Sequence, residues 1–114
     1  MDWENLDFNL CNMDFYDSNI MRELNLEPYP DLSTINSDQE KYDTIEKFFT
    51  EIINKVKSSD NERDTIFSKL RACEMDSQIY QNLKMDYIKI LYRLAILERQ
   101  RERAFEYLKK NKTN

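Results

Sequence analysis

The sequence predicts an all-α protein, an elongated helical bundle or hairpin with a long C-terminal helix and an acidic, amphipathic N-terminal arm. Three observations predict this class. The 114 residues include no glycine, which β-hairpin turns and phosphate-binding loops usually need. The two prolines, Pro28 and Pro30, lie close together, so the chain after them lacks strong helix breakers. Apolar residues then recur at steps of three and four, which is the spacing of one helix face.

Residues 1–26 form the predicted arm, in one or more helical segments. Its first seventeen residues hold five acids, which keep an otherwise apolar segment hydrated. The apolar side chains expected on one helix face, or on the row beside it, are Trp3, Leu6, Phe8, Leu10 and Met13. Three roles stay open for this arm. It packs on the chain's own long helix, it docks as a helix into a groove on a partner, or it is an acidic activation-type tail.

Residues 27–36 (EPYPDLSTIN) indicate a connector, because each proline favours an extended backbone at the residue before it. The remaining residues, 37–114, form the predicted helical domain. Its first helix is expected over about 38–58, since Ser37 and Glu40 are spaced as a capping box. In that motif each of the two side chains accepts a hydrogen bond from the backbone N–H of the other residue.

The polar stretch SSDN at 58–61 predicts an interruption, after which a second helix runs over about 60–75. A third helix is expected over about 77–110, and at about 1.5 Å per residue it is longer than about 45 Å. Its central part is apolar on more than one face, which is unusual for a helix with one wet side. We therefore expect a partner chain to cover part of this surface, through Tyr87, Leu91 and Leu94.

The chain lacks the residues that most enzymes use. It has no histidine, the commonest general base, and its two cysteines, Cys11 and Cys73, form no metal-binding motif. Carboxylate pairs such as Asp60 and Asp64 fit a hydrated helix surface better than an acid–base pair. We predict no catalytic residue, no cofactor and no metal site, and therefore a protein that is not an enzyme.

Charge is divided unevenly along the chain. Residues 1–36 hold eight acids and one base, whereas residues 84–114 hold nine bases and four acids. The basic end suggests an alternative, nucleic-acid-binding surface made of Arg99, Arg101, Arg103, Lys109 and Lys110. Glutamates lie among these residues and the whole chain has a net charge of −5, so nucleic acid is not expected to be the main ligand.

Residues 85–108 (MDYIKILYRLAILERQRERAFEYL) mix apolar and arginine positions along one helix. In this respect they resemble the long basic helices of GINS replication subunits. The resemblance covers these 24 residues and includes no motif that is diagnostic of the family. It implies a subunit of a helical assembly in the nucleus.

Taken together, these features predict a non-catalytic protein–protein interaction subunit or adaptor of a larger helical assembly. Its partner is another protein chain, with a hetero-oligomer favoured and a homodimer as a variant. Nucleic-acid binding through the basic helix is the first alternative, and a small acidic inhibitor that docks into a partner's groove is the second. The sequence has neither signal-peptide features nor the roughly 18 apolar residues of a membrane span. We therefore expect an intracellular protein, in the nucleus or cytoplasm, that is not secreted and binds no membrane.

Overall fold

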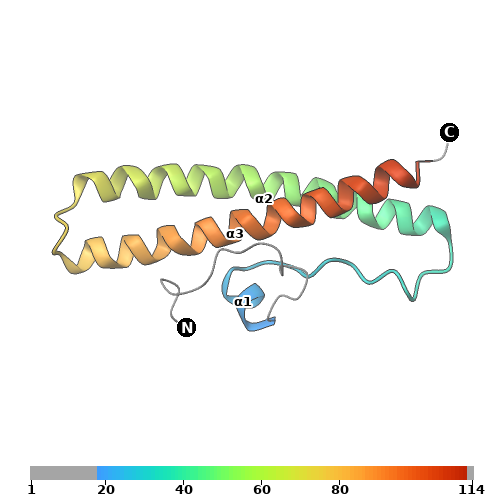
Figure 1. Cartoon of the computed structure of the whole chain (residues 1–114), viewed down its shortest axis with the longest axis horizontal. Coiled ribbons are helices and arrows are strands. Elements are labelled where there is room, and N and C mark those ends of the chain that lie inside the picture. Colours follow the sequence, from blue (N-terminus) through green and yellow to red (C-terminus); the bar gives the residue numbers. More distant parts are fainter. Residues whose placement is uncertain (1–17, 113–114) are drawn as a thin grey trace.

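The computed structural model describes residues 18–112 of the chain. Over this range it contains three helices and no strand: α1 (Ser18–Glu23), α2 (Asp38–Ala72) and α3 (Gln78–Lys110). Figure 1 shows α2 and α3 side by side as an antiparallel hairpin, with α1 and the chain that follows it along one side of α3. The molecule measures 57 × 24 × 20 Å. The predicted all-α, elongated hairpin is confirmed.

The ends of the long helices follow local sequence signals. The Ser37 hydroxyl accepts a hydrogen bond from the backbone N–H of Glu40 at 3.3 Å, so the helix start expected there is correct. At the start of α3, the Ser77 hydroxyl accepts from the N–H of Tyr80 at 3.0 Å and donates to the carbonyl of Glu74 at 2.8 Å. One serine therefore fixes both the start of α3 and the turn before it.

The predicted interruption at 58–61 is wrong. Instead of two helices over about 38–58 and 60–75, α2 is continuous for 35 residues and ends at Ala72. Ser59, within the expected interruption, is inside the hairpin and only 2% exposed. Serine, aspartate and asparagine are weak helix formers but cost only a few tenths of a kcal/mol each in a helix. Packing between α2 and α3 is strong enough to override that local preference.

Residues 18–36, which we call the strap, consist of α1 and the extended chain that leads to α2. After α1 the chain turns at Asn25, whose φ of 57° is in the left-handed region that asparagine tolerates better than most residues. The strap then runs along α3. The Arg93 side chain donates to the Leu24 carbonyl at 2.9 Å, and the Gln100 side chain donates to the Glu27 carbonyl at 2.8 Å.

Further along, the strap is held by two aromatic contacts. The guanidinium group of Arg103 lies 3.9 Å from the ring centre of Tyr29, close enough for a cation–π interaction. The same ring meets Phe48 of α2 edge to face, with 5.3 Å between ring centres. Tyr29 therefore joins the strap to both long helices, and the predicted connector is part of the packed structure.

The hydrophobic core lies where the strap covers the hairpin. In the described part of the chain, the buried apolar residues of α2 and α3 occur up to Ile52 in α2 and from Ile90 onward in α3. Three elements meet there, and the core cluster comprises Met21, Leu24, Leu26, Ile45, Phe48, Ile52, Tyr92, Ile96, Leu97 and Ala104. Between Ile52 and Ile90 the apolar side chains of the two long helices are half-buried or exposed. For residues 18–112, the hairpin thus has a proximal half with a third layer, the strap, and a distal half made mainly of two layers, α2 and α3.

Replacing Leu24 with alanine tests whether the strap is part of the folded core. The Leu24 side chain is 0% exposed, so Leu24→Ala should lower the free energy of unfolding by about 2–5 kcal/mol. Urea denaturation followed by circular dichroism measures this loss. Ile79→Ala, at an exposed position, is the control and should change stability by less than about 0.5 kcal/mol. Equal effects of the two substitutions would mean that the strap does not stabilise the hairpin.

Candidate interaction surfaces

The residues predicted to bind a partner fall into two groups. Those of the arm, Trp3, Leu6, Phe8, Leu10 and Met13, lie outside the described residues. The end of the predicted arm is in the strap, where Met21, Leu24 and Leu26 are buried against the chain's own hairpin. For this part of the arm the structure therefore has the self-packing arrangement. The three helical residues Tyr87, Leu91 and Leu94 are half-buried in α3.

Two pairs of aromatic rings bridge α2 and α3. Phe49 meets Phe105 with 6.4 Å between ring centres, and Phe67 meets Tyr87 with 6.0 Å, both at an interplanar angle of 36°. One ring of each pair is open to solvent: Phe105 is 53% exposed and Phe67 is 47% exposed. These pairs mark the two ends of a surface that we call the aromatic face.

Helix geometry places both pairs on the same face of the hairpin. The two α2 residues, Phe49 and Phe67, are 18 positions apart, as are the two α3 residues, Tyr87 and Phe105. Eighteen residues make about five complete turns, so the second ring of each helix lies above the first at a distance of about 27 Å. The spacing thus aligns four aromatic rings in two rows that run along the hairpin.

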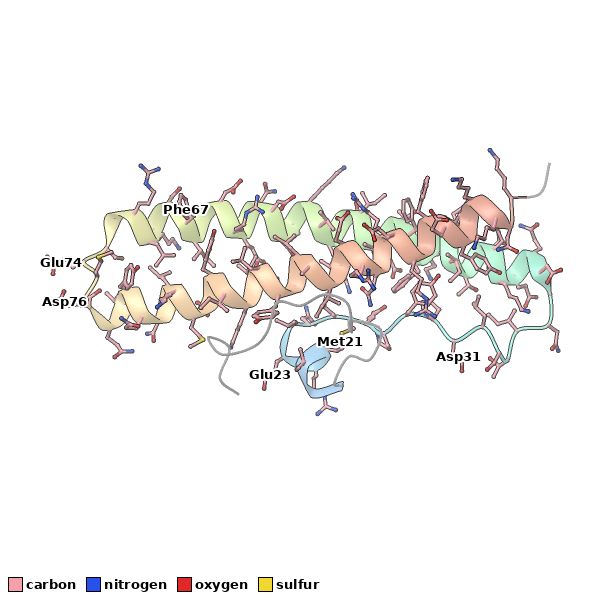
Figure 2. The ribbon with its side chains drawn as sticks, viewed as in Figure 1. Met21, Glu23, Asp31, Phe67, Glu74 and Asp76 are labelled. Carbon is pink, nitrogen blue, oxygen red and sulfur yellow. The ribbon has the colours of Figure 1, made fainter. Side chains whose placement is uncertain are left out.

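The aromatic face points away from the strap. Phe48, which contacts the strap, is next to Phe49 and so about 100° from it around α2. Arg103, which also contacts the strap, is two positions from Phe105 and about 200° from it around α3. Figure 2 shows Phe67 on α2, toward the turn between the long helices, and Met21 in the strap, beyond α3. The strap therefore leaves this face uncovered.

Between the two aromatic pairs, the face carries both aliphatic and charged side chains. Its half-buried aliphatic side chains are Ile53, Val56, Leu91 and Leu94. Arg63 forms ion pairs with Asp60 at 3.4 Å and Asp64 at 3.6 Å, and Arg101 forms one with Glu98. Three of the predicted contact residues, Tyr87, Leu91 and Leu94, thus belong to the aromatic face.

A second surface, which we call the tip, lies at the turn between α2 and α3. Its apolar members are Met75, which is 76% exposed, and Ile79, which is 65% exposed. Glu74 and Asp76 flank Met75 in sequence, and Figure 2 shows both at the end of the hairpin. Among residues 18–112, the exposed large apolar side chains are Phe67, Phe105, Met75 and Ile79, so each belongs to the aromatic face or to the tip.

The basic residues of α3 do not form one surface. Arg101 pairs with Glu98, whereas Arg103 lies on the Tyr29 ring, and the two arginines are about 200° apart around the helix. Arg99 is half-buried, and Lys109 and Lys110 are exposed in the last turn. Two of the three arginines thus have partners within the chain, which leaves less of the positive charge for phosphate.

A shallow cavity of about 770 Å³ lies between the strap and the end of α3. Arg103 and Lys110 line it, but so do the carboxylates of Asp31 and Glu106, so it offers an anion no clear excess of positive charge. Burial raises the pKa of Tyr29 above its usual 10.0, although Arg103 opposes the rise and Tyr107 adds to it. Hydrogen bonds from Ser33 lower the pKa of Asp31.

Within the described range, no group of three or more histidine, cysteine, aspartate or glutamate side chains could hold a metal ion. In that same part of the chain, α1 to α3 include no stretch that is long and apolar enough to span a membrane. No protein-family model matches the chain, and neither a curated protein nor a solved structure matches it. The resemblance of residues 85–108 to GINS subunits thus gains no support.

The sequence reasoning did not identify four important positions: Phe67 and Phe105 of the aromatic face, and Met75 and Ile79 of the tip. A signal for the first two was present, because aromatic residues 18 positions apart in one helix share a face. For Phe67 that signal could be used only after α2 was known to be continuous, whereas for Phe105 it was available within the helix predicted over about 77–110. Met75 and Ile79 are ordinary apolar residues in the sequence, and only the position of the turn exposes them.

The ionisation of Tyr29 predicts how stability depends on pH. Its raised pKa means that folding favours the neutral phenol, so this stability is present below pH 10.0 and is lost as the pH rises through the folded-state pKa. As the pH rises from about 9 to about 11, the free energy of unfolding should fall less for Tyr29→Phe than for the wild-type protein. Urea titrations at each pH measure the difference. Parallel curves for the two proteins would contradict the role assigned to Tyr29.

Proposed function

We propose that the chain is a non-catalytic interaction subunit whose tip inserts into another protein. The observation that carries this proposal is the exposure of Met75 and Ile79, the two most exposed large apolar side chains of residues 18–112. Methionine is enriched at protein interfaces, and burying a side chain of this size contributes about 1.5–3 kcal/mol. Burying these two side chains in a specific partner is therefore more favourable than exposing them to water.

The chemistry of the tip defines the partner that it fits. Because Glu74 and Asp76 are exposed beside the apolar side chains, the complementary surface is an apolar pocket with a basic rim. The tip is held in shape by Ser77, which caps α3 and also bonds to the Glu74 carbonyl. A preorganised tip loses little conformational freedom on binding, which favours affinity.

The two alternatives from the sequence are weaker on different grounds. Nucleic-acid binding is disfavoured because Arg101 and Arg103 already have partners within the chain and lie on opposite sides of α3. An acidic inhibitor would use the same tip, since an acidic turn with an apolar centre suits either role. We favour the subunit because the tip is one end of a molecule 57 Å long, which leaves most of the surface available for other contacts.

The test uses the full-length chain with a photo-crosslinking residue in place of Met75, which identifies the protein chain that contacts the tip. Affinity for that purified partner is then measured for wild-type and variant chains by calorimetry. The double variant Met75→Ser/Ile79→Ser should weaken binding at least about tenfold, because both apolar anchors are lost. Glu74→Gln/Asp76→Asn should weaken it less, and mainly at low salt.

Phe105→Ser is the matched control, since Phe105 is also an exposed apolar residue but lies far from the tip. It should leave affinity for the partner unchanged. If the partner binds the Met75→Ser/Ile79→Ser variant as tightly as the wild-type chain, the tip is not the binding surface and the proposal fails. If nuclease treatment before irradiation abolishes the crosslink, the contact depends on nucleic acid and the proposal also fails.

A further inference from the structure

We infer that the aromatic face binds a second copy of this chain, so that two hairpins form a four-helix assembly. This surface is separate from the tip, and the inference does not depend on the partner proposed for the tip. The face contains two of the exposed large apolar side chains, Phe67 and Phe105, and the strap leaves it uncovered. Its pattern of residues indicates which partner covers it.

The pattern repeats between the two helices. Residues of α2 on this face and the residues 38 positions later in α3 have the same chemical character at every step. The matching pairs are Phe49 and Tyr87, Ile53 and Leu91, Val56 and Leu94, Asp60 and Glu98, Arg63 and Arg101, and Phe67 and Phe105. Each pair combines two aromatic, two aliphatic, two acidic or two basic side chains.

In an antiparallel hairpin this repeat becomes an approximate two-fold symmetry. A half-turn about an axis perpendicular to the face exchanges α2 with α3, and with them Phe49 with Tyr87 and Phe67 with Phe105. Both ends of the face therefore carry an aromatic pair, about 27 Å apart, with ion pairs between them. Because its two ends are alike, this face can lie against the same face of a second copy with one aromatic pair against another, in the isologous arrangement of a two-fold dimer.

The charges of the face also suit a second copy. Its two basic residues, Arg63 and Arg101, are each paired on their own helix with the acids Asp60, Asp64 and Glu98, which gives the face a net charge of −1. Two such faces therefore meet with only a small excess of negative charge, although the whole chain has a net charge of −5. A partner of strongly positive or negative surface would gain nothing from this balance.

The size and position of the face are adequate for a dimer. The strip between the aromatic pairs is about 27 Å long and, over two helices, about 20 Å wide, so its flat area is about 540 Å², roughly two thirds of the 800 Å² that each partner of a standard interface buries, before the relief of its side chains is added. Two helical hairpins packed face to face make a four-helix bundle, a stable arrangement for elements of this length. The half-buried residues of the distal half would then gain a third and fourth layer.

The experiment measures the mass of the full-length chain by sedimentation velocity over a range of concentrations. The wild-type protein should sediment as a dimer, at twice the chain mass of 13.9 kDa. Phe67→Glu and Phe105→Glu should each raise the dimer dissociation constant at least about tenfold, and by similar amounts because the symmetry makes the two positions equivalent. Circular dichroism confirms that the variants keep their helices, as expected for half-exposed positions.

Met75→Ser/Ile79→Ser is the control, since it removes exposed apolar side chains from the tip and leaves the aromatic face intact. It should dimerise like the wild-type chain even where it loses the partner of the tip, so the two proposals can fail separately. A chain that is monomeric at every concentration overturns the inference. So does a dimer that survives both glutamate substitutions, or a monomer whose aromatic face is occupied by a different protein.

Discussion

The antiparallel contact between α2 and α3 is the interaction on which the rest of the structure depends. Two helices of 35 and 33 residues pack against each other, and their buried apolar residues face this contact. Such a pair buries one side of each helix and leaves the two flanks of the contact open. The strap closes one flank of the proximal half, where Leu24, Ile45 and Leu97 are almost completely buried. The other flank is the aromatic face. The core under the strap and the aromatic face therefore both result from the contact between α2 and α3.

Local signals in the sequence predicted the parts of the fold that interactions between residues close in sequence determine. Ser37 is the helix cap that its spacing from Glu40 indicates, and the period of three and four gives the direction of each stripe. The expected interruption at 58–61 failed because a buried Ser59 in a continuous seam is a property of two helices together. For the same reason the exposure of Phe67 could not be predicted, since it depends on how the continuous α2 packs against α3. Non-local contacts decided both points.

Basic side chains of α3 hold the strap through directional contacts. The strap contacts α3 through Arg93 and Arg103, and these side chains bind the carbonyl of Leu24 and the ring of Tyr29. Directional contacts of this kind fix the position of the strap, whereas exposed ion pairs contribute less than about 1 kcal/mol. The apolar contact of Leu24 and its neighbours supplies the stability. The basic side chains Arg93 and Arg103 thus position the strap, and they are less available for contacts with other molecules.

The aromatic face and the tip have compatible positions on one molecule. The tip lies at the distal end of the long axis, whereas the aromatic face runs along the hairpin between its two aromatic pairs. A partner on the face therefore leaves Met75 and Ile79 accessible, and a pair of hairpins presents two tips to other chains. Because the approximate two-fold repeat makes the two ends of the face alike, it permits a copy in either direction. The strap covers only the proximal half of each hairpin. The flank that carries the strap therefore lacks the approximate two-fold symmetry of the aromatic face. Asymmetry outside the face must therefore select which of the two directions the dimer adopts.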